Sequence, residues 1–447
     1  MSLILPGLAI AASLSAQAAD KPNVILVIWD TTRADHLSLY GHERPTTPNL
    51  DRIASNATVF EDAQASGYWT LPSAASLFTG LFGHNHKVEY SPYKTKDYSL
   101  ELPDTVVTLA EALKEQGYRT GLFSASKLVS DNKSYSQGFD IYERSSEAPM
   151  GDKVLNFIDE SGDQPWFTVM WYLTPHAPYE PDPEFDLWSL EGVAPLNVRG
   201  CNEDVDWKDH YYSQCDLNSG RIKLTDQQWE QLRRQYDGEV RRNDTRLGAF
   251  WKDLEERGIE DETLFVFTSD HGEAFAGHPS SMAWHGKPYW DNQTVPLVLR
   301  LPGKFPAKRI KSAVRTMDIY PTILELAGAT VPSVINAESL MPTLSGNAPD
   351  RTNVGFNHGG LHYYRDSEHK LIFVRKDEKH PFHRPELYLI KTDPKEQNNV
   401  APVNFAKANQ VHESMMQFME KTAVGHEQAN TVNQDQIDLL REMGYVE

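Results

Sequence analysis

The stretch Leu264–His271, LFVFTSDH, indicates what kind of fold this chain adopts. Its first five residues form a short apolar run rich in β-forming side chains, which is typical of a strand buried on both faces. The polar residues Ser269, Asp270 and His271 follow at once. Open sheets of parallel strands bind ligands at the carboxyl ends of their strands, so Asp270 and His271 are candidates for a functional site. An Asp-His pair in a turn can also cap a helix, and the rest of the chain must decide between the two interpretations.

Two further apolar runs repeat this pattern. Asn23–Trp29 (NVILVIW) precedes Asp30, and Trp166–Leu173 (WFTVMWYL) precedes a segment that contains His176. Between the runs, apolar residues recur at helical spacing, most clearly over Trp229–Leu254. Strands that alternate with helices predict an α/β fold with a large, mostly parallel, doubly wound sheet.

The domain organisation follows from changes in this pattern along the chain. Residues 20–350 carry the alternating strands and helices and are predicted to form the main domain, with an irregular acidic insertion at about 180–225. Residues 351–447 are predicted to form a smaller C-terminal α+β subdomain. Its expected elements are two short strands and a closing helix, at Lys370–Val374, Glu386–Ile390 and Phe405–Glu420.

Residues 1–19 are predicted to be a signal peptide. An apolar run ends in Ala16-Gln17-Ala18, which matches the cleavage site of such signals, although no Lys or Arg precedes the run. The run is too short and too rich in Ala and Ser for a membrane span, and no later stretch reaches about 18 uninterrupted apolar residues. We therefore expect a periplasmic or secreted protein without a membrane span.

Composition restricts the partners of this protein. Its 447 residues carry a formal net charge of -20, which argues against nucleic acid as a partner. An anionic substrate is still compatible, since a metal ion and a few cations can reverse the potential inside a pocket. The two cysteines, Cys201 and Cys215, lie in the insertion, and we expect them to pair in an oxidising compartment. The sequence does not indicate the oligomeric state.

The polar segments together resemble the motifs of a known family. From about Lys21 to its end, the chain is similar to the sulfatase branch of the alkaline phosphatase superfamily. The matching segments, in the family's order, are Asp30–Leu37 (DTTRADHL), Thr70–Gly80 (TLPSAASLFTG), His176–Tyr179 (HAPY), Ser269–Glu273 (SDHGE), His285–Lys287 (HGK), Val295-Pro296 and Leu439–Val446 (LLREMGYV), the last in a terminal helix. The resemblance implies the α/β fold described above and the hydrolysis of a phosphoric or sulfuric ester.

The resemblance also implies one divalent metal ion, bound by Asp30, Thr70, Asp270 and His271. The chemistry supports this set, because two carboxylates and an imidazole suit a divalent ion that holds an oxygen nucleophile. Thr70 Oγ1 is the expected nucleophile, with its pKa lowered by the ion. The family's second aspartate in the first segment is Thr31 here, so fewer carboxylates are present. The expected ion is therefore calcium, or zinc or manganese, and a second metal site is not evident.

Further residues are expected around the substrate. Lys287 and His176, in two of the matching segments, would hold its anionic oxygens and take part in catalysis. Lys127, which follows a predicted strand end on the same side, would assist in binding. His285 would be the general acid that protonates the leaving group, and in that role its pKa should lie near neutrality. Each residue also has a plainer interpretation: the histidines as buried, hydrogen-bonded imidazoles and the lysines as surface residues.

Two departures from the family pattern bear on the substrate. In the family's sulfatases the nucleophile is a Cys or Ser converted to an aldehyde hydrate, and an Arg lies four residues later. Thr70 and Ala74 occupy these positions here. A Thr cannot become that aldehyde, and a plain Thr nucleophile is the pattern of the superfamily's phosphodiesterases and phosphoethanolamine transferases.

The expected activity is therefore metal-dependent hydrolysis of a phosphate mono- or diester, of a small molecule or a glycan, by attack of Thr70. Two alternatives stay open. One is a sulfatase that acts on sulfate esters, such as those of carbohydrates, through an unmodified Thr. The other is a catalytically silent binding protein, which Ala74 in place of the family's Arg keeps open. The plainer interpretation of the Thr70 hydroxyl is a helix cap. The natural leaving group has no readable motif.

Overall fold

The computed structural model describes residues 21–89, 100–201, 211–356, 360–375 and 382–424. The predicted signal peptide and the terminal helix expected at Leu439–Val446 lie outside these residues, as does part of the insertion. Among the described residues, no helix is both long and apolar enough to cross a bilayer.

A nine-stranded central sheet organises the described residues. Its strands are β1 (Asn23–Trp29), β2 (Thr58–Gln64), β3 (Arg119–Ser124), β4 (Ile141–Arg144), β5 (Trp166–Tyr172), β8 (Thr263–Thr268), β11 (Thr294–Arg300), β12 (Lys308–Ile310) and β13 (Val314–Arg315). They follow the order β12-β2-β11-β8-β1-β5-β3-β4, and β13 also pairs with β2. All pairings are parallel except those of β11 with β2 and β8. The predicted large, mostly parallel sheet is confirmed.

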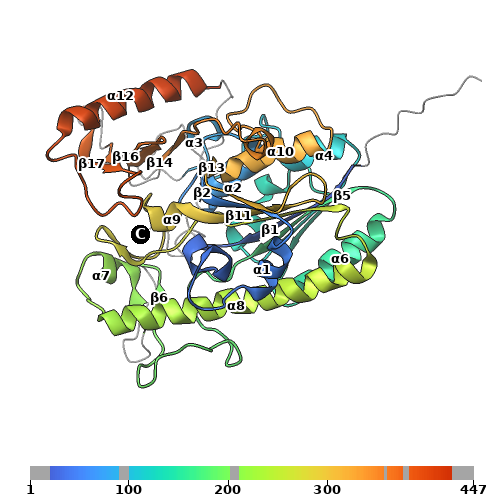
Figure 1. Ribbon diagram of the computed structural model, residues 1–447, viewed down its shortest axis with the longest axis horizontal. Coiled ribbons are helices and arrows are strands. Elements are labelled where there is room, and N and C mark those ends of the chain that lie inside the picture. Colours follow the sequence, from blue (N-terminus) through green and yellow to red (C-terminus); the bar gives the residue numbers. More distant parts are fainter. Residues whose placement is uncertain (1–20, 90–99, 202–210, 357–359, 376–381, 425–447) are drawn as a thin grey trace, which may run out of the picture.

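Helices cover both faces of this sheet (Figure 1). The helices on one face are α2 (Thr70–Thr79), α4 (Leu109–Glu115) and α10 (Ile319–Leu326), and those on the other are α1 (Pro48–Ala54), α6 (Met150–Ser161) and α8 (Asp226–Arg257). Successive residues of β1 enter opposite layers, because side chains alternate along a strand: Leu26 lies in the first core and Val27 in the second. The sheet is therefore doubly wound.

The long helix α8 crosses the second face and supplies much of its core (Figure 1). It begins with a capping box between Thr225 and Gln228. It ends at Gly258, whose φ of 67° is a left-handed conformation that glycine adopts without a Cβ clash. Trp229 and Trp251 are buried on its inner side, as the helical spacing predicted.

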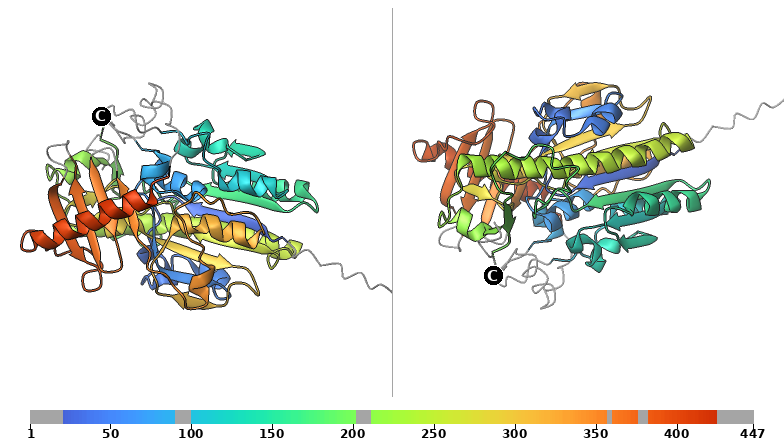
Figure 2. Two further views of the ribbon diagram at one scale, coloured as in Figure 1. Left: turned by 90° about the horizontal axis from the view of Figure 1, so that it is seen from above. Right: turned by 90° about the horizontal axis from the view of Figure 1, so that it is seen from below.

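The C-terminal region forms a smaller antiparallel sheet. It comprises β14 (Asn353–Phe356), β15 (Leu361–Arg365), β16 (His369–Val374) and β17 (His383–Leu389), with α12 (Phe405–Thr422) packed on β16 and β17. Figure 2 shows this sheet and α12 beside one end of the central sheet. The two strands and the closing helix expected from the sequence are present.

The insertion is less irregular than predicted. Within it, β6 (Asn197–Arg199) and β7 (Tyr211–Ser213) pair in parallel, and α7 (Gln214–Asn218) follows. Cys201 and Cys215 form the expected disulfide, with Cα atoms 5.1 Å apart. Strands of three residues carry no periodic signal, so the sequence pattern could not reveal them.

Short elements occupy the remaining loops. They are α3 (Gly83–His86), α5 (Lys127–Ser130), α9 (Trp290–Gln293), α11 (Met341–Leu344), the antiparallel pair β9 (Phe275–His278) and β10 (Ser281–Ala283), and the 3-10 helices Ala34–His36, Ser38–Tyr40, Lys133–Ser136 and Thr316–Asp318.

Candidate functional site

The candidate site lies where β1 and β8 end. These strands pair in parallel with Ile28 opposite Thr268, so Asp30 and Asp270, two residues further along each strand, come together at the same edge of the sheet. Parallel pairing predicts this meeting of the two polar segments. The possibility that Asp270 and His271 are only a helix cap does not hold, because no helix follows β8 directly.

Asp30, Asp270 and His271 form a compact group. Nε2 of His271 lies 3.7 Å from Oδ1 of Asp30 and 3.3 Å from Oδ2 of Asp270. Oγ1 of Thr70 lies 3.4 Å from the same nitrogen. All four side chains are almost completely buried. The structure therefore brings the four predicted metal ligands together.

Neighbouring groups leave one donor atom of each ligand turned toward this common space. Nδ1 of His271 donates to the carbonyl of Gly272 at 2.9 Å, which places the proton on Nδ1 and leaves the Nε2 lone pair available. Oδ1 of Asp270 accepts from two backbone N–H groups, and Oδ2 of Asp30 accepts from the indole of Trp171. The other oxygens, Oδ2 of Asp270 and Oδ1 of Asp30, are buried without a hydrogen-bond partner among the described residues.

This set of donors fits a divalent cation. The carboxylate and hydroxyl oxygens suit calcium, and the imidazole suits zinc or manganese, so the donors are compatible with each of the expected ions. Two buried carboxylates this close repel each other, and burial together with the charge of Asp270 raises the pKa of Asp30 well above its usual range. A cation beside Asp30 would favour the ionised form of its carboxylate.

Thr70 is the first residue of α2. Trp69 occupies the N-cap position in an extended conformation, and no side-chain cap hydrogen bond is made there. The interpretation of the Thr70 hydroxyl as a helix cap is therefore wrong, and its oxygen faces His271 instead. Ala74 lies one turn later, packed in the core beside the sheet, so α2 brings no cation from that position.

His176 and His285 lie beside the ligand group. The ring centroids of His285 and His271 are 4.5 Å apart, and those of His285 and His176 are 5.0 Å apart. The indole of Trp284 stacks on His285 and meets His176 edge-on. Nδ1 of His176 donates to the carbonyl of Ala177 at 2.7 Å, while its Nε2 is buried without a hydrogen-bond partner in the described part of the chain.

The pKa values of these histidines differ from the expectation. Burial lowers the pKa of His176 to about 4. Burial, and then the neighbouring His271 and His176, lower the pKa of His285 well below its usual value. The expectation that His285 has a pKa near neutrality is therefore wrong for the free protein. Oε1 of Glu273 lies 3.5 Å from Nδ1 of His285, and burial raises the pKa of Glu273 to about 8.

The two lysines come from different parts of the chain, Lys287 from the segment between β10 and α9 and Lys127 from the start of α5. Lys287 donates from Nζ to the carbonyl of Ser280, in the turn between β9 and β10, and burial lowers its pKa. In the part of the chain that the structure describes, it makes no hydrogen bond or ion pair with Thr70. Lys127 begins α5 shortly after β3, a strand parallel to β5, so it lies at the same edge of the sheet as the ligand group.

Sequence reasoning missed several residues that shape the site. Trp171 holds Asp30, and the hydroxyl of Tyr236 accepts from the N–H of Arg33 and donates to the carbonyl of Thr31. An aromatic residue in an apolar strand or on a helix face is normally read as core, so neither residue gave a signal. Glu273 did have a sequence signal, since it lies in the SDHGE segment.

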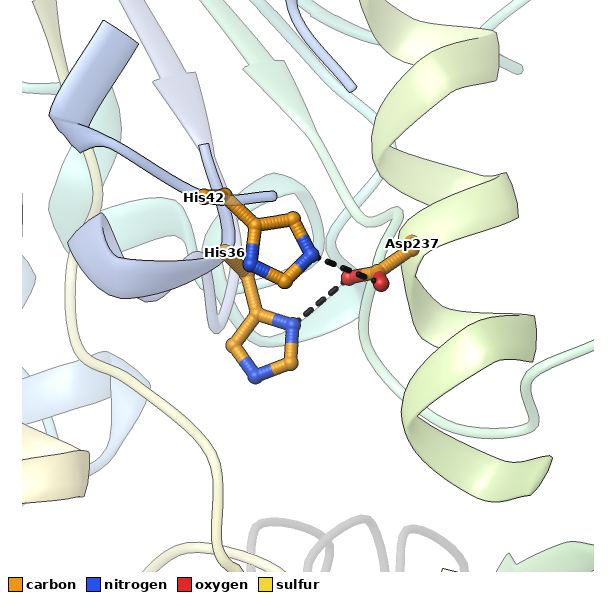
Figure 3. A group of neighbouring side chains, drawn as sticks. All are labelled: His36, His42 and Asp237. Carbon is orange, nitrogen blue, oxygen red and sulfur yellow. Dashed lines mark hydrogen bonds and ion pairs between the residues drawn. The ribbon is translucent and has the colours of Figure 1, made fainter. Parts of the chain in front are cut away.

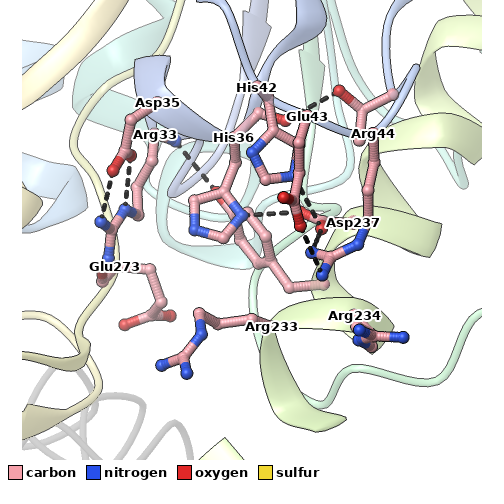
Figure 4. Close-up of polar contacts among 12 residues, drawn as sticks. Arg33, Asp35, His36, His42, Glu43, Arg44, Arg233, Arg234, Asp237 and Glu273 are labelled. Carbon is pink, nitrogen blue, oxygen red and sulfur yellow. Dashed lines mark hydrogen bonds and ion pairs between the residues drawn. The ribbon is translucent and has the colours of Figure 1, made fainter. Parts of the chain in front are cut away.

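A second group of histidine and aspartate side chains lies nearby. Figure 3 shows the rings of His36 and His42 directed at Asp237 of α8, with Nδ1 of His36 2.6 Å and Nε2 of His42 3.0 Å from its carboxylate oxygens. Arg44 donates to the same carboxylate at 2.7 Å (Figure 4). Three donors, one of them a permanent cation, satisfy both oxygens of Asp237. We interpret this group as a network that joins α8 to the loop after β1, not as a metal site.

Comparison with known proteins identifies relatives of this chain. The family model described as Sulfatase matches residues 22–329, and the model described as N-sulphoglucosamine sulphohydrolase, C-terminal, matches residues 283–424. The N-acetylglucosamine-6-O-sulfatase of Bacteroides thetaiotaomicron is 25% identical, over 94% of this chain and 90% of that protein. A multifunctional alkaline phosphatase superfamily protein of Trinickia caryophylli is 22% identical, over 80% and 84%. The solved phosphonate monoester hydrolase of Agrobacterium radiobacter has the same fold, with a TM-score of 0.71 at 21% identity over 90% of this chain and 96% of that chain.

Proposed function

We propose that this protein is a metal-dependent hydrolase that cleaves a phosphate mono- or diester with Thr70 as the nucleophile. The chain belongs to the sulfatase family, because the family model matches well over half of its residues. The observation that carries the proposal is the place of the Thr70 hydroxyl, 3.4 Å from Nε2 of His271 in the group formed with Asp30 and Asp270. A hydroxyl in that place is a nucleophile that needs no conversion to an aldehyde.

The reaction has two steps. Thr70 Oγ1 attacks the phosphorus, the bond from phosphorus to the leaving oxygen breaks, and the phosphoryl group is transferred to Thr70. Water then cleaves the Thr70 ester, so that one ester and one water become an alcohol and a phosphate. The proton lost by Thr70 is matched by the proton that the leaving alcohol gains. A divalent ion, when bound by Asp30, Asp270 and His271, supplies the positive charge that lowers the pKa of the hydroxyl and neutralises the substrate.

The two neutral histidines acquire their roles when substrate binds. An anionic ester brings negative charge beside His176 and His285, and nearby negative charge raises the pKa of an imidazole. His176 then donates from Nε2 to an anionic oxygen. His285 gives its proton to the leaving oxygen, with Glu273 beside its Nδ1. Lys287 holds an anionic oxygen of the substrate together with His176, and Lys127 assists in binding.

Hydrolysis of a sulfate ester through the unmodified Thr70 is the second candidate. The match to an N-sulphoglucosamine sulphohydrolase model and the likeness to an N-acetylglucosamine-6-O-sulfatase favour it, and they favour a carbohydrate as the alcohol. A catalytically silent protein is the third candidate, which Ala74 supports because it replaces the family's cation. We also propose export to the periplasm or the medium, since the Cys201–Cys215 disulfide is of a kind that persists in oxidising compartments.

The test is turnover of three chromogenic esters by the wild type and by matched variants. Purified protein is assayed with p-nitrophenyl phosphate, bis(p-nitrophenyl) phosphate and p-nitrophenyl sulfate. Thr70→Val removes the hydroxyl and keeps the side-chain shape. Thr79→Val is its control on the same helix, because the buried Thr79 hydroxyl donates to the carbonyl of Ala75 and not into the site. We expect phosphate turnover that falls at least about a thousandfold in Thr70→Val and stays near the wild-type rate in Thr79→Val.

Each other result points to a different candidate. Turnover of the sulfate ester alone would replace our proposal by the second candidate. An absence of turnover, together with no metal in elemental analysis, would support the silent protein. Turnover that persists in Thr70→Val would show that another group is the nucleophile.

A further inference from the structure

Asn218, the last residue of α7, binds the backbone of β10 through its side-chain amide. Its Oδ1 accepts from the N–H of Met282 at 3.0 Å and from that of Ala283 at 3.3 Å. Its Nδ2 donates to the carbonyl of Ala283 at 3.0 Å. One side chain thus satisfies three backbone groups of a strand that has only three residues. The insertion is therefore joined to β10 by directional contacts as well as by packing.

The chain leaves β10 directly into the site. Trp284 follows Ala283 with a φ of 71°, a left-handed conformation that a bulky residue adopts only where the surrounding structure holds it. Its indole stacks on His285 with ring centroids 5.1 Å apart and meets His176 at 5.0 Å. A shift of β10 would therefore move the ring of His285 and the indole that covers both histidines.

His285 is held from both sides along the chain. On its far side, the N–H of Gly286 donates to the carbonyl of Tyr68 at 3.0 Å, next to the segment that carries Thr70. On its near side, β10 pairs with β9 over few residues and with an irregular register, so the three bonds from Asn218 are a large part of what fixes it.

The other end of α7 is anchored within the insertion. Cys215, three residues before Asn218, is bonded to Cys201, two residues after the end of β6. Ser213 caps the helix by accepting from the N–H of Cys215 at 3.2 Å. Asn218 is thus the last residue of a short helix, α7, which the Cys201–Cys215 disulfide holds within the insertion and whose end contacts β10.

We propose that Asn218 is a positioning residue for His285, acting through β10 and Trp284. The insertion then sets the orientation of the acid that protonates the leaving group. The proposal rests on the role given to His285 under the proposed function. It predicts that substitution of Asn218 lowers kcat more for a substrate with a poor leaving group than for one with a good leaving group. A good leaving group needs little protonation, and a poor one needs much.

The experiment compares two substrates of one reaction type, p-nitrophenyl phosphate and phenyl phosphate. Asn218→Ala removes all three bonds. Asn218→Asp keeps the shape and the acceptor oxygen but sets a second oxygen against the Ala283 carbonyl, and it serves if the first variant folds poorly. Ser219→Ala is the control, because Ser219 is the exposed neighbour of Asn218 and its hydroxyl donates to the carbonyl of Asp216 and accepts from the exposed Arg221, not from β10. His285→Ala provides the reference defect.

We expect both Asn218 variants to lower kcat for phenyl phosphate about tenfold or more beyond any loss with p-nitrophenyl phosphate, as a displaced acid should. His285→Ala should show the same dependence more strongly, and Ser219→Ala should leave both rates unchanged. A purely structural role of Asn218 would lower the two rates by the same factor, and that result would overturn the proposal while His285 kept its role. If His285→Ala shows no leaving-group dependence, His285 is not the acid, and its role and the positioning by Asn218 fall together.

Discussion

Replacing Asp237 by asparagine tests how much its buried network contributes to stability. The Asp237 carboxylate is inaccessible to solvent and accepts from His36, His42 and Arg44. Asparagine keeps the volume and one acceptor oxygen, but its NH₂ group faces donors. Breaking one partner of a buried ion pair costs about 3–5 kcal/mol. Arg44 retains Glu230 as a second partner, so we expect a loss at the lower end, about 3 kcal/mol of the free energy of unfolding.

The loss should depend on pH in a defined direction. Burial acts to raise the pKa of Asp237, but the charge of His36 and the hydrogen bonds from His36 and His42 outweigh it and hold that pKa well below its usual range. A carboxyl whose pKa is lowered by folding stabilises the protein above its unfolded pKa of about 3.9 and loses this contribution as the pH falls through the folded pKa. The difference between wild type and variant should therefore be full at pH 7 and smaller below about pH 4.

Urea denaturation followed by circular dichroism at pH 7 and at pH 3.5 measures both effects. Glu256→Gln is the control, because Glu256 lies on the same helix in an exposed pair with Lys252, and such pairs contribute about 0.5 kcal/mol or less. A loss under about 1 kcal/mol for Asp237→Asn, or an equal loss at both pH values, would refute the reasoning.

Two further predictions concern the metal and the disulfide. Dialysis against a chelator should abolish turnover and lower the Tm, and re-addition of calcium, manganese or zinc one at a time should identify the ion. The Tm of Asp30→Asn should not respond to any of these ions. A chelator that leaves the wild-type Tm unchanged would contradict the assigned ligands. Replacing Cys201 and Cys215 together by serine should lower the free energy of unfolding by about 3 kcal/mol in the chain-entropy model. A reducing agent should lower the Tm of the wild type but not that of the double variant. An equal response of both proteins would show that the disulfide does not stabilise the fold.

The parts of the fold that were predictable have local signatures. The apolar run at Asn23–Trp29 coincides with β1, and the helical spacing around Trp229 predicted most of α8. A buried strand reads the same in either direction, so the run at 295–299 did not reveal that β11 is antiparallel to both of its neighbours. The direction depends on how the chain connects, which no short segment encodes.

The candidate site likewise has residues that could be predicted from the sequence and residues that could not. Asp30 and Asp270 could be predicted because each directly follows an apolar run, and the ends of parallel strands meet at one edge. Trp171, which holds Asp30, and Asn218, which holds β10, act on residues far away in the sequence. Their chemistry is visible only once the strands are assembled. Resemblance alone assigned Lys287 to the substrate, and the structure shows its ammonium at the Ser280 carbonyl.

The loops after β1 and β8 are cross-linked to each other before any ion binds. The N–H of Thr32 donates to Oγ of Ser269 at 2.8 Å, and Arg33 donates to the carbonyl of Glu273 at 2.9 Å. These bonds fix the distance between the Asp30 and Asp270 carboxylates against their mutual repulsion. Ion binding then requires little rearrangement of the backbone, and preorganised donors retain more of the interaction free energy for binding. Substitutions of Ser269 or Arg33 should therefore weaken ion affinity even though neither residue is a ligand of the ion.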